Sequence, residues 1–235
     1  MKVAIMQPYL FPYIGYWQLI NAVDTFVLLD DVNFIKSGYI NRNRILINGQ
    51  AYMFSVPIRN ASQNCMIKDT KLSFDAKERR KFLTRLENSY KKAPYYQMVI
   101  SYLEKIITND TDDLTEYIKY SIEEIIRFLK IETSVLRSSE ISKDNSLKGQ
   151  DRIIDICKCL KADIYINACG GRILYQREAF KAQNLELLFL DTKMDGVKYH
   201  QFRNDFVEKL SIIDVMMFNS GQEIQKFLQE YDLNR

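Results

Sequence analysis

Glycine and proline are scarce in this sequence, whose 235 residues include 8 Gly and 4 Pro. Disordered segments are rich in such residues and β-sandwiches need many tight turns, so this scarcity argues against both. Hydrophobic residues make up 47% of the chain and charged residues 27%, which is a globular balance with enough apolar material for one core. We therefore expect a single α/β domain over residues 1–235.

The sequence also lacks the segments that direct a chain into a membrane or across it. No stretch of 18 apolar residues is present, and Gln7, Pro8 and Pro12 interrupt the short apolar run near Met1 before a signal-peptide core could form. We therefore expect a cytoplasmic protein with no membrane insertion. Its four cysteines are expected to be reduced thiols in that compartment: Cys65, Cys157, Cys159 and Cys169.

Charges of both signs are mixed along the chain, and side chains that bind transition metals are few. The chain has 33 basic and 30 acidic residues, a net charge of +3, and no run of five like charges, which gives no support to a nucleic-acid partner. Its single histidine and scattered cysteines offer no tetrahedral metal site, and Cys157-x-Cys159 lacks the usual spacing of zinc ligands. We expect no metal site and no cofactor, apart from Mg²⁺ that a diphosphate ligand could carry.

The first 30 residues predict a βαβ unit. Lys2–Met6 is a short apolar run ended by Gln-Pro, as in a buried strand, and Ile14–Val23 has apolar residues at helical spacing. Asp24–Leu29 is a second apolar run. Because a crossover of this kind joins parallel strands, a parallel sheet is expected. A hairpin is expected next, with strands at 45–47 and 52–56 around the turn Asn48-Gly49.

The remaining chain alternates helices with short strands. The fold class we predict is α/β and Rossmann-like, with a mostly parallel sheet, a nucleotidylyltransferase-like N-terminal βαβ unit, a helical insert at about 75–132 and a helical C-terminus. Helices are predicted at 75–88, 94–107, 113–130, 147–160, 178–183, 211–217 and 221–231, and strands at 133–137, 163–167 and 185–190.

The loop Gln7–Tyr16 joins the first strand to a helix N-terminus, where free backbone N–H groups favour an anion. Tyr13-Ile14-Gly15-Tyr16 has the spacing of the Thr/His-x-Gly-His signature of nucleotidylyltransferases, but tyrosines replace both catalytic positions. Histidine-assisted nucleotidyl transfer is therefore not expected. The alternative is an ordinary strand-to-helix turn. From this loop we expect four ligand-binding residues: Gln7, Tyr13, Gly15 and Tyr16.

A second polar segment, Asp30–Arg44, follows the second strand, where open α/β sheets bind ligands. Asp30 or Asp31 could act as a base, hold Mg²⁺ or bind a ribose. Arginines two residues apart favour an anion clamp, because the guanidinium fork matches phosphate geometry. The alternative is a solvated loop with a structural Asp–Arg pair. The binding residues expected here are Lys36, Asn41, Arg42, Asn43 and Arg44.

A third segment, 198–221, supplies the other candidates. His200 is a candidate base because histidine is the side chain used most often in general acid–base catalysis. Ser211 fits a helix N-cap with Asp214 in a capping-box-like position, which is the structural alternative for both. Cys169, beside two glycines, is either a nucleophile or a packed small residue. The binding residues expected here are Tyr199, Gln201, Ser211, Asp214 and Asn219.

The chain resembles the WbqC-like protein family. The resemblance is carried by QPYLFPYIGY at 7–16, DTFVLLDDVNFIKSGYINRNRI at 24–45 with SVPI at 55–58, INACGGRILY at 166–175, YHQF at 199–202 and LSIIDVMMFNSG at 210–221. It implies a bacterial protein from gene clusters for O-antigen, capsule or other surface polysaccharides, acting on a nucleotide-activated sugar. The chemically capable residues in the matching motifs are Gln7, Asp30, Asp31, Asn41, Arg42, Asn43, Arg44, Tyr199, Gln201, Ser211, Asp214 and Asn219.

Two functions are compatible with these motifs. In a transferase, Arg42, Arg44 and Lys36 would hold the diphosphate, while the loop 9–16 and Tyr39 would stack on the base or sugar. Acyl or aminoacyl transfer to an amino sugar is the reaction we expect, with a proton accepted by one of three candidate bases: Asp30, Asp31 or His200. The alternative is a non-catalytic binding or assembly factor of the polysaccharide machinery. In both cases we expect the three segments to line one concave pocket.

Overall fold

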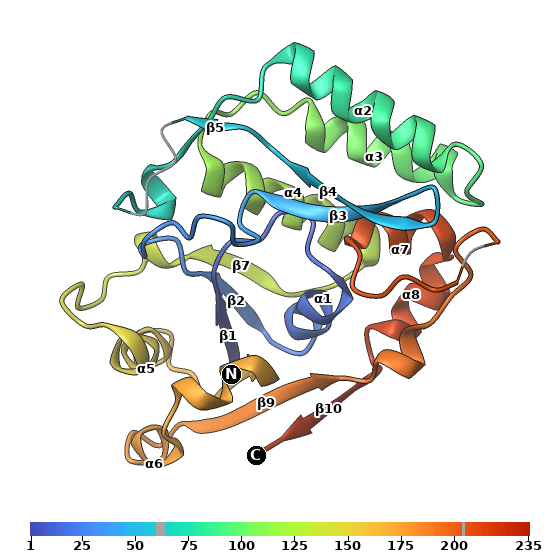
Figure 1. The fold of residues 1–235 in the computed structure, drawn as a ribbon. Helices are drawn as coiled ribbons and strands as arrows, with labels where there is room; N and C mark the ends of the chain where they lie inside the picture. Colours follow the sequence, from blue (N-terminus) through green and yellow to red (C-terminus); the bar gives the residue numbers. More distant parts are fainter. Residues whose placement is uncertain (60–63, 204) are drawn as a thin grey trace.

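A six-stranded, mostly parallel sheet forms the centre of the protein in the computed structural model, which describes residues 1–59, 64–203 and 205–235 (Figure 1). Its spatial order is β10-β9-β8-β1-β2-β7, and every neighbouring pair is parallel except β9 and β10. The strands are β1 (Lys2–Met6), β2 (Thr25–Leu28), β7 (Ser134–Arg137), β8 (Ile164–Ala168), β9 (Glu186–Thr192) and β10 (Tyr231–Asn234).

Helices cover both faces of this sheet because successive side chains of each central strand point to opposite faces. Val3 and Ile5 of β1 pack in one cluster with α5 (Gly149–Cys159) and α6 (Arg177–Lys181). Ala4 faces the other way, into the cluster that includes α1 (Ile14–Asn21). Strands buried on both faces read as nearly continuous apolar runs, which is why KVAIM and TFVL are legible in the sequence.

The direction of winding reverses beside β1. From β1 the chain crosses through α1 to β2, and later reaches β7 on the same side; α5 then carries it back to β8, on the other side of β1. In chain order the five parallel strands are therefore arranged 3-2-1-4-5. The connections that leave the carboxyl ends of β1 and β8 run in opposite directions, toward β2 and β9. Open α/β sheets bind ligands at such a topological switch point.

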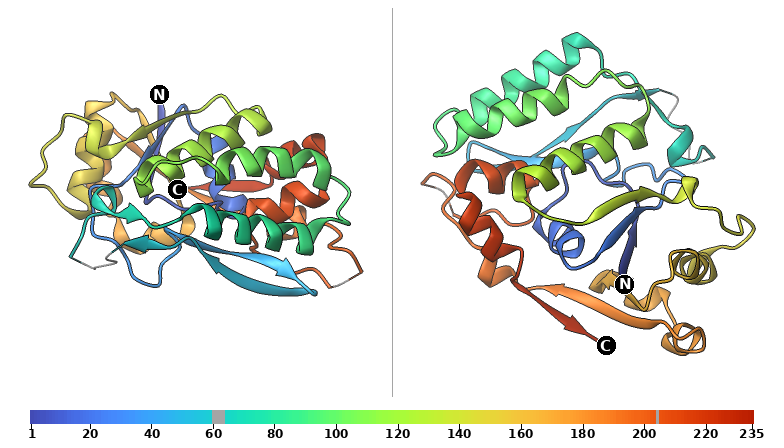
Figure 2. Two further views of the ribbon diagram at one scale, coloured as in Figure 1. Left: turned by 90° about the horizontal axis from the view of Figure 1, so that it is seen from above. Right: turned by 180° about the vertical axis from the view of Figure 1, so that it is seen from behind.

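The long segment between β2 and β7 forms a second part of the molecule, outside the sheet. The predicted hairpin is confirmed as β3 (Arg42–Ile47) and β4 (Gln50–Ser55), with Asn48 and Gly49 at φ 50° and 76°. A short pair, β5 (Ile58–Arg59) and β6 (Lys71–Leu72), precedes the helical insert. The insert consists of α2 (Ala76–Tyr90), α3 (Tyr96–Ile107) and α4 (Leu114–Leu129). Figure 2 shows these helices and the hairpin on the side of the molecule away from β9 and β10.

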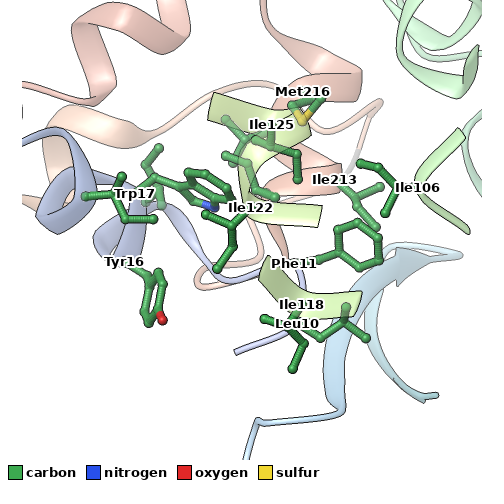
Figure 3. Close-up of a cluster of buried hydrophobic side chains, with 14 of the residues drawn as sticks. Leu10, Phe11, Tyr16, Trp17, Ile106, Ile118, Ile122, Ile125, Ile213 and Met216 are labelled. Carbon is green, nitrogen blue, oxygen red and sulfur yellow. The ribbon is translucent and has the colours of Figure 1, made fainter. Parts of the chain in front are cut away.

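The insert shares one apolar cluster with the sheet (Figure 3). Ile118, Ile122 and Ile125 of α4 lie with Trp17 of α1, and α7 (Ile212–Phe218) contributes further side chains. α4 begins at Asp113, whose carboxylate accepts a hydrogen bond from Glu116 N at 2.8 Å. Leu10 and Phe11 are fully buried in the same cluster, so they anchor the loop after β1 in the hydrophobic core.

Two predictions about local structure are wrong. The tail was expected to be helical to residue 231, but α8 (Gly221–Phe227) is followed by β10, which pairs antiparallel with β9. Arg42 and Arg44 were expected in a loop, but they belong to β3. In the described part of the chain, none of the helices has the length and apolar character needed to cross a bilayer.

Candidate functional site

A pocket of about 560 Å³ opens at the switch point between β1 and β8. The loop after β1, the first residues of α1, and the 3-10 turn Cys169–Leu174 after β8 surround it, and Tyr39 lies at its edge. Its lining residues are Ile5, Met6, Gln7, Pro8, Tyr9, Tyr13, Gly15, Tyr16, Leu19, Leu29, Tyr39, Ile40, Ile153, Asn167, Ala168, Gly170, Gly171, Leu174 and Tyr175. We call it the switch-point pocket.

The lining of this pocket is aromatic and uncharged. Five tyrosines contribute to it, and no Asp, Glu, Lys, Arg or His is among the described residues that line it. The Tyr9 ring lies 5.7 Å from that of Tyr16 and 5.4 Å from that of Tyr39, centroid to centroid. Burial raises the pKa of the Tyr13 phenol above its ordinary value, so this group stays neutral at physiological pH. Such a surface suits a flat or sugar ring.

Two amide side chains supply the polar groups of the pocket. Asn167 ends β8 and is 4% exposed; its Oδ1 accepts from Ala168 N at 2.9 Å, while Nδ2 has no hydrogen-bond partner among the described residues. Gln7 follows β1, and its backbone carbonyl accepts from the Tyr16 hydroxyl at 3.0 Å. Its own amide likewise makes no hydrogen bond within the described ranges, so both amides are available to a ligand.

Two glycines keep the pocket wall in place. A Cβ on Gly171 would lie 2.2 Å from Asn167 Nδ2, and a Cβ on Gly15 would lie 2.6 Å from both Thr192 Oγ1 and Tyr13 Cε2. Any larger residue at either position must therefore displace a side chain that shapes the pocket. Gly170, in contrast, has nothing within 4 Å of the corresponding position.

The loop after β1 is held from the side away from the pocket. The Asn43 amide donates to the carbonyls of Leu10 and Phe11, and Ser211 Oγ donates to Phe11 O at 2.8 Å. Ile212 N donates to the carbonyl of Pro12 at 2.9 Å. These bonds stabilise a residue at φ 46°, Phe11, that would otherwise avoid the left-handed region. Asn43 and Ser211 therefore support the site without lining it.

The acidic pair is tied into buried ion pairs at the carboxyl ends of β2 and β7. Asp30 is fully buried and accepts from Arg137 Nε at 2.9 Å and from Ser139 N at 2.9 Å. Asp31 meets Lys143 Nζ at 2.7 Å, and the Lys143 side chain is 1% exposed. Hydrogen bonds and charge from Lys143 outweigh burial and lower the pKa of Asp31. The structural alternative is favoured here, although the partners are not Arg42 and Arg44.

The arginines of β3 do not form a fork around a common point. They point to one side of the strand, but Arg42 donates to the carbonyls of Ser37 and Gly38, and Arg44 Nη2 donates to Lys209 O at 3.2 Å. Arg44 Nε is buried without a partner among the described residues. The Asn41 amide donates to Val56 O at 2.8 Å; Lys36 is exposed and lies outside the lining of the switch-point pocket.

The third segment forms a separate buried network and does not line the switch-point pocket, contrary to the expectation of one shared pocket. Asp214 is fully buried and accepts from Tyr199 at 2.6 Å, Gln201 Nε2 at 2.7 Å and Tyr90 at 2.8 Å. Burial outweighs these hydrogen bonds and raises the pKa of Asp214 to about 6. Asn219 donates to the carbonyl of Val215 at 2.8 Å.

The interpretation of Ser211 and Asp214 as helix-capping residues is correct for Ser211 only. Ser211 accepts from Ile213 N at 3.2 Å and caps α7, whereas the Asp214 carboxylate is used in the network just described. A reciprocal capping box occurs instead at Ser220 and Glu223 of α8.

The remaining nucleophile and base candidates lie on the surface. His200 is exposed and is not part of the pocket lining. Cys169 is also exposed rather than packed, and the neighbouring Asp191 carboxylate raises the pKa of its thiol, which disfavours the nucleophilic thiolate. Asp191 itself accepts from Arg172 at 2.7 Å. The described residues include no group of three or more His, Cys, Asp and Glu that could hold a metal ion.

Sequence reasoning missed the contribution of β8 to the pocket. Asp163–Asn167 and the following Cys-Gly-Gly were recognised as a strand and a turn, but nothing local indicates that this strand pairs with β1. The usable signal was the pair of glycines directly after a buried strand. It marks a close approach of the backbone to another group.

The model of the WbqC-like protein family matches residues 7–226. The "Uncharacterized protein Rv1507c" of Mycobacterium tuberculosis is 26% identical over 232 residues, which covers 97% of each chain. No solved structure matches this chain.

Proposed function

Because the chain belongs to the WbqC-like protein family, we propose that it is an enzyme that modifies a nucleotide-activated sugar of bacterial surface polysaccharide synthesis, bound in the switch-point pocket. One observation carries the proposal: an aromatic, uncharged pocket lies where an open α/β sheet reverses its winding, and the amide nitrogens of Gln7 and Asn167 in its lining have no hydrogen-bond partner among the described residues. Within this proposal the chain is a single Rossmann-like domain with a nucleotidylyltransferase-like first βαβ unit.

The lining suggests how the ligand would lie. The base or sugar ring would stack against Tyr9 and Tyr39, and the amides of Gln7 and Asn167 would bind its polar edge. The diphosphate would lie toward α1, whose N-cap residue, Tyr13, makes no side-chain capping bond. Free N–H groups at a helix N-terminus favour an anion. The arginines of β3 would contribute only after leaving their backbone partners.

Acyl or aminoacyl transfer is the reaction we propose. An amine on the sugar would attack the carbonyl carbon of the acyl donor and form an amide as the bond from that carbon to the rest of the donor breaks. The amine's proton would pass to a base, and the released donor fragment would take up a proton. Of the three candidate bases, Asp30 and Asp31 are held in ion pairs and His200 lies on the surface. Any of them would have to reach the ligand through a movement of its segment.

The second candidate is a non-catalytic binding factor of the polysaccharide machinery. The observation that favours it is the absence of a carboxylate or imidazole among the described residues lining the pocket, since a tyrosine with a raised pKa is protonated at neutral pH and cannot accept the proton of the amine. Mass spectrometry separates the two: an enzyme incubated with nucleotide sugars and acyl donors yields a sugar of increased mass, and a binding factor does not.

Two glycines give a matched test of binding. Gly171→Ala forces the Asn167 amide out of its position, whereas Gly221→Ala adds a methyl group to open space outside the pocket lining. We expect Gly171→Ala to weaken nucleotide-sugar binding about tenfold, the scale of one lost hydrogen bond in a buried site, and Gly221→Ala to leave it unchanged. Calorimetric titration with nucleoside-diphosphate sugars measures both. Equal losses in the two variants, or no binding to the wild-type protein, would reject the pocket as the site.

A further inference from the structure

A second concavity, of about 820 Å³, lies at the other end of the β3–β4 hairpin and shares no residue with the switch-point pocket. The second half of α2 and the residues after it form one wall; the hairpin turn and Phe202 form the other. We call it the α2 groove. Its lining residues are Leu46, Ile47, Asn48, Gly49, Lys81, Thr84, Arg85, Asn88, Ser89, Lys91, Lys92 and Phe202.

The charge of this groove is of one sign. Four cations line it, Lys81, Arg85, Lys91 and Lys92, and none of its described lining residues is acidic. Ion pairing neutralises little of this charge. Of the four groove cations, only Lys81 has a carboxylate within 4 Å among the described residues, that of Glu78 at 3.9 Å. Lys91 and Lys92 follow α2, where cations also complement the helix dipole. The helix dipole does not explain Lys81 and Arg85, which lie well inside the helix.

The Arg85 guanidinium is already positioned. It lies over the Tyr52 ring of β4, 5.2 Å from the centroid, so the cation is restrained in the absence of a carboxylate partner. Asn48 and Asn88 lie in the same lining with their amide side chains, and so does Ser89, whose hydroxyl donates to the Arg85 carbonyl at 2.8 Å. Restrained cations with neighbouring neutral donors match the oxygen atoms of a phosphate or diphosphate.

Phe202 is held in an unfavourable backbone conformation at the groove wall. Its φ is 54°, a region that bulky residues rarely adopt, yet its side chain remains 40% exposed. The ring packs edge-on against Phe218 at 4.7 Å between centroids. The preceding Gln201 fixes the backbone, because its Oε1 accepts from Val207 N at 2.7 Å and its Nε2 donates to Asp214. A strained aromatic residue beside an open groove indicates a functional constraint.

Arg85, Lys91 and Lys92 have no carboxylate partner in the part of the chain that the structure describes, and the groove wall carries a strained aromatic residue. From these two observations together we propose that the α2 groove is a second binding site, for a nucleoside diphosphate or an equivalent phosphate-bearing ring compound. Lys81, Arg85 and Lys92 hold the phosphates, and the ring lies against Phe202. The volume is in the range of sites that enclose small-molecule ligands. This site is additional to the switch-point pocket, and its existence does not depend on the reaction proposed there.

Calorimetric titration with a nucleoside diphosphate and with pyrophosphate, at low ionic strength, tests the proposal. The double variant Arg85→Ala/Lys92→Ala should bind both about tenfold or more weakly, since each cation contributes a charge-assisted hydrogen bond. Lys77→Ala/Arg80→Ala is the matched control: it removes the same charge from α2, outside the groove lining, and should change affinity less than about twofold, as expected for screened surface charges. Binding of both ligands to a Gly171→Ala protein should be unchanged at this site.

A third variant tests the ring. Phe202→Gly removes the aromatic face and relieves the left-handed strain, so the fold is kept. The nucleoside diphosphate should lose about threefold to tenfold in affinity, the scale of one stacking contact, while pyrophosphate loses none. Equal losses in the two double variants, no binding of either ligand to the wild-type protein, or tighter binding of short single-stranded RNA than of the diphosphate would each overturn the proposal.

Discussion

Asp214 gives the sharpest test of the energetics described above. Its carboxyl group is buried beneath the β3–β4 hairpin, with Tyr90, Tyr199 and Gln201 as hydrogen-bond donors. The pKa rises from 3.8 to about 6 because burial destabilises the charged carboxylate more than its three hydrogen bonds stabilise it. Since one pKa unit corresponds to about 1.4 kcal/mol, charging this group in the folded protein costs about 3 kcal/mol relative to the unfolded chain.

The sign of the effect follows from proton binding. Between pH 3.8 and about 6, the folded protein binds more protons at Asp214 than the unfolded chain does. Its contribution to stability is therefore fully present below pH 3.8 and is lost as the pH rises through 6. Asp214→Asn abolishes this titration. The free energy of unfolding of the wild type minus that of the variant should fall by about 3 kcal/mol between pH 3.5 and 6.5.

Urea denaturation across this pH range measures the difference. Trp17, the single tryptophan, is fully buried, and its fluorescence reports the loss of the core. Lost hydrogen bonds in the Asn variant shift its stability by an amount that does not depend on pH, so only the slope of the difference is diagnostic. A difference that stays constant from pH 3.5 to 6.5 would refute the reasoning, and would mean that the three donors stabilise the charged carboxylate fully.

Three further predictions concern the ion pairs and the pocket wall. Arg137→Ala leaves the buried Asp30 carboxylate without its cation and should lower the free energy of unfolding, measured in urea, by about 3–5 kcal/mol. As a control, Arg172→Ala removes an exposed arginine and should lower it by less than about 1 kcal/mol. Equal losses in the two variants would contradict the argument that the buried ion pair matters more. Gly15→Ala should displace the Tyr13 ring and weaken nucleotide-sugar binding about tenfold with little change in melting temperature. Arg42→Ala removes the guanidinium that anchors the turn before β3 and lies 5.9 Å from the Tyr39 ring centroid. Calorimetry should therefore show the same loss of affinity for nucleosides as for nucleotides. A loss of affinity confined to phosphate-bearing ligands would restore the anion-clamp interpretation.

The predictable part of the fold is the part with strong periodicity. Strands buried on both faces and helices with one apolar face were legible, and so was the hairpin turn at Asn48-Gly49. β10 was not, because Tyr-Asp-Leu-Asn at an antiparallel edge alternates apolar and polar residues over only four positions, soon after a helix ends. Its pairing with β9 is a tertiary contact that no local pattern encodes.

The candidate site was predictable only on one side. Gln7, Tyr13, Gly15 and Tyr16 do line a pocket at the carboxyl end of the first strand, as a general rule for α/β sheets led us to expect. Whether a polar side chain elsewhere faces that pocket or the interior depends on packing. Asp214 looked like a surface cap because its hydroxyl and amide donors come from residues 13 to 124 positions away in the chain.

The position of β1 in the sheet has a consequence for how the protein acquires its structure during synthesis. β1 and β2 are separated by one short helix, but the other neighbour of β1 begins at Ile164. Until that strand has been made, β1 presents an open, apolar edge, which is a template for pairing with other chains. Contacts across so long a stretch also form slowly. A nascent chain that stops before Ile164 would contain Gln7, Tyr13 and Tyr39 and still lack one wall of the switch-point pocket. The pocket is therefore complete only after the last third of the molecule has folded against the first strand.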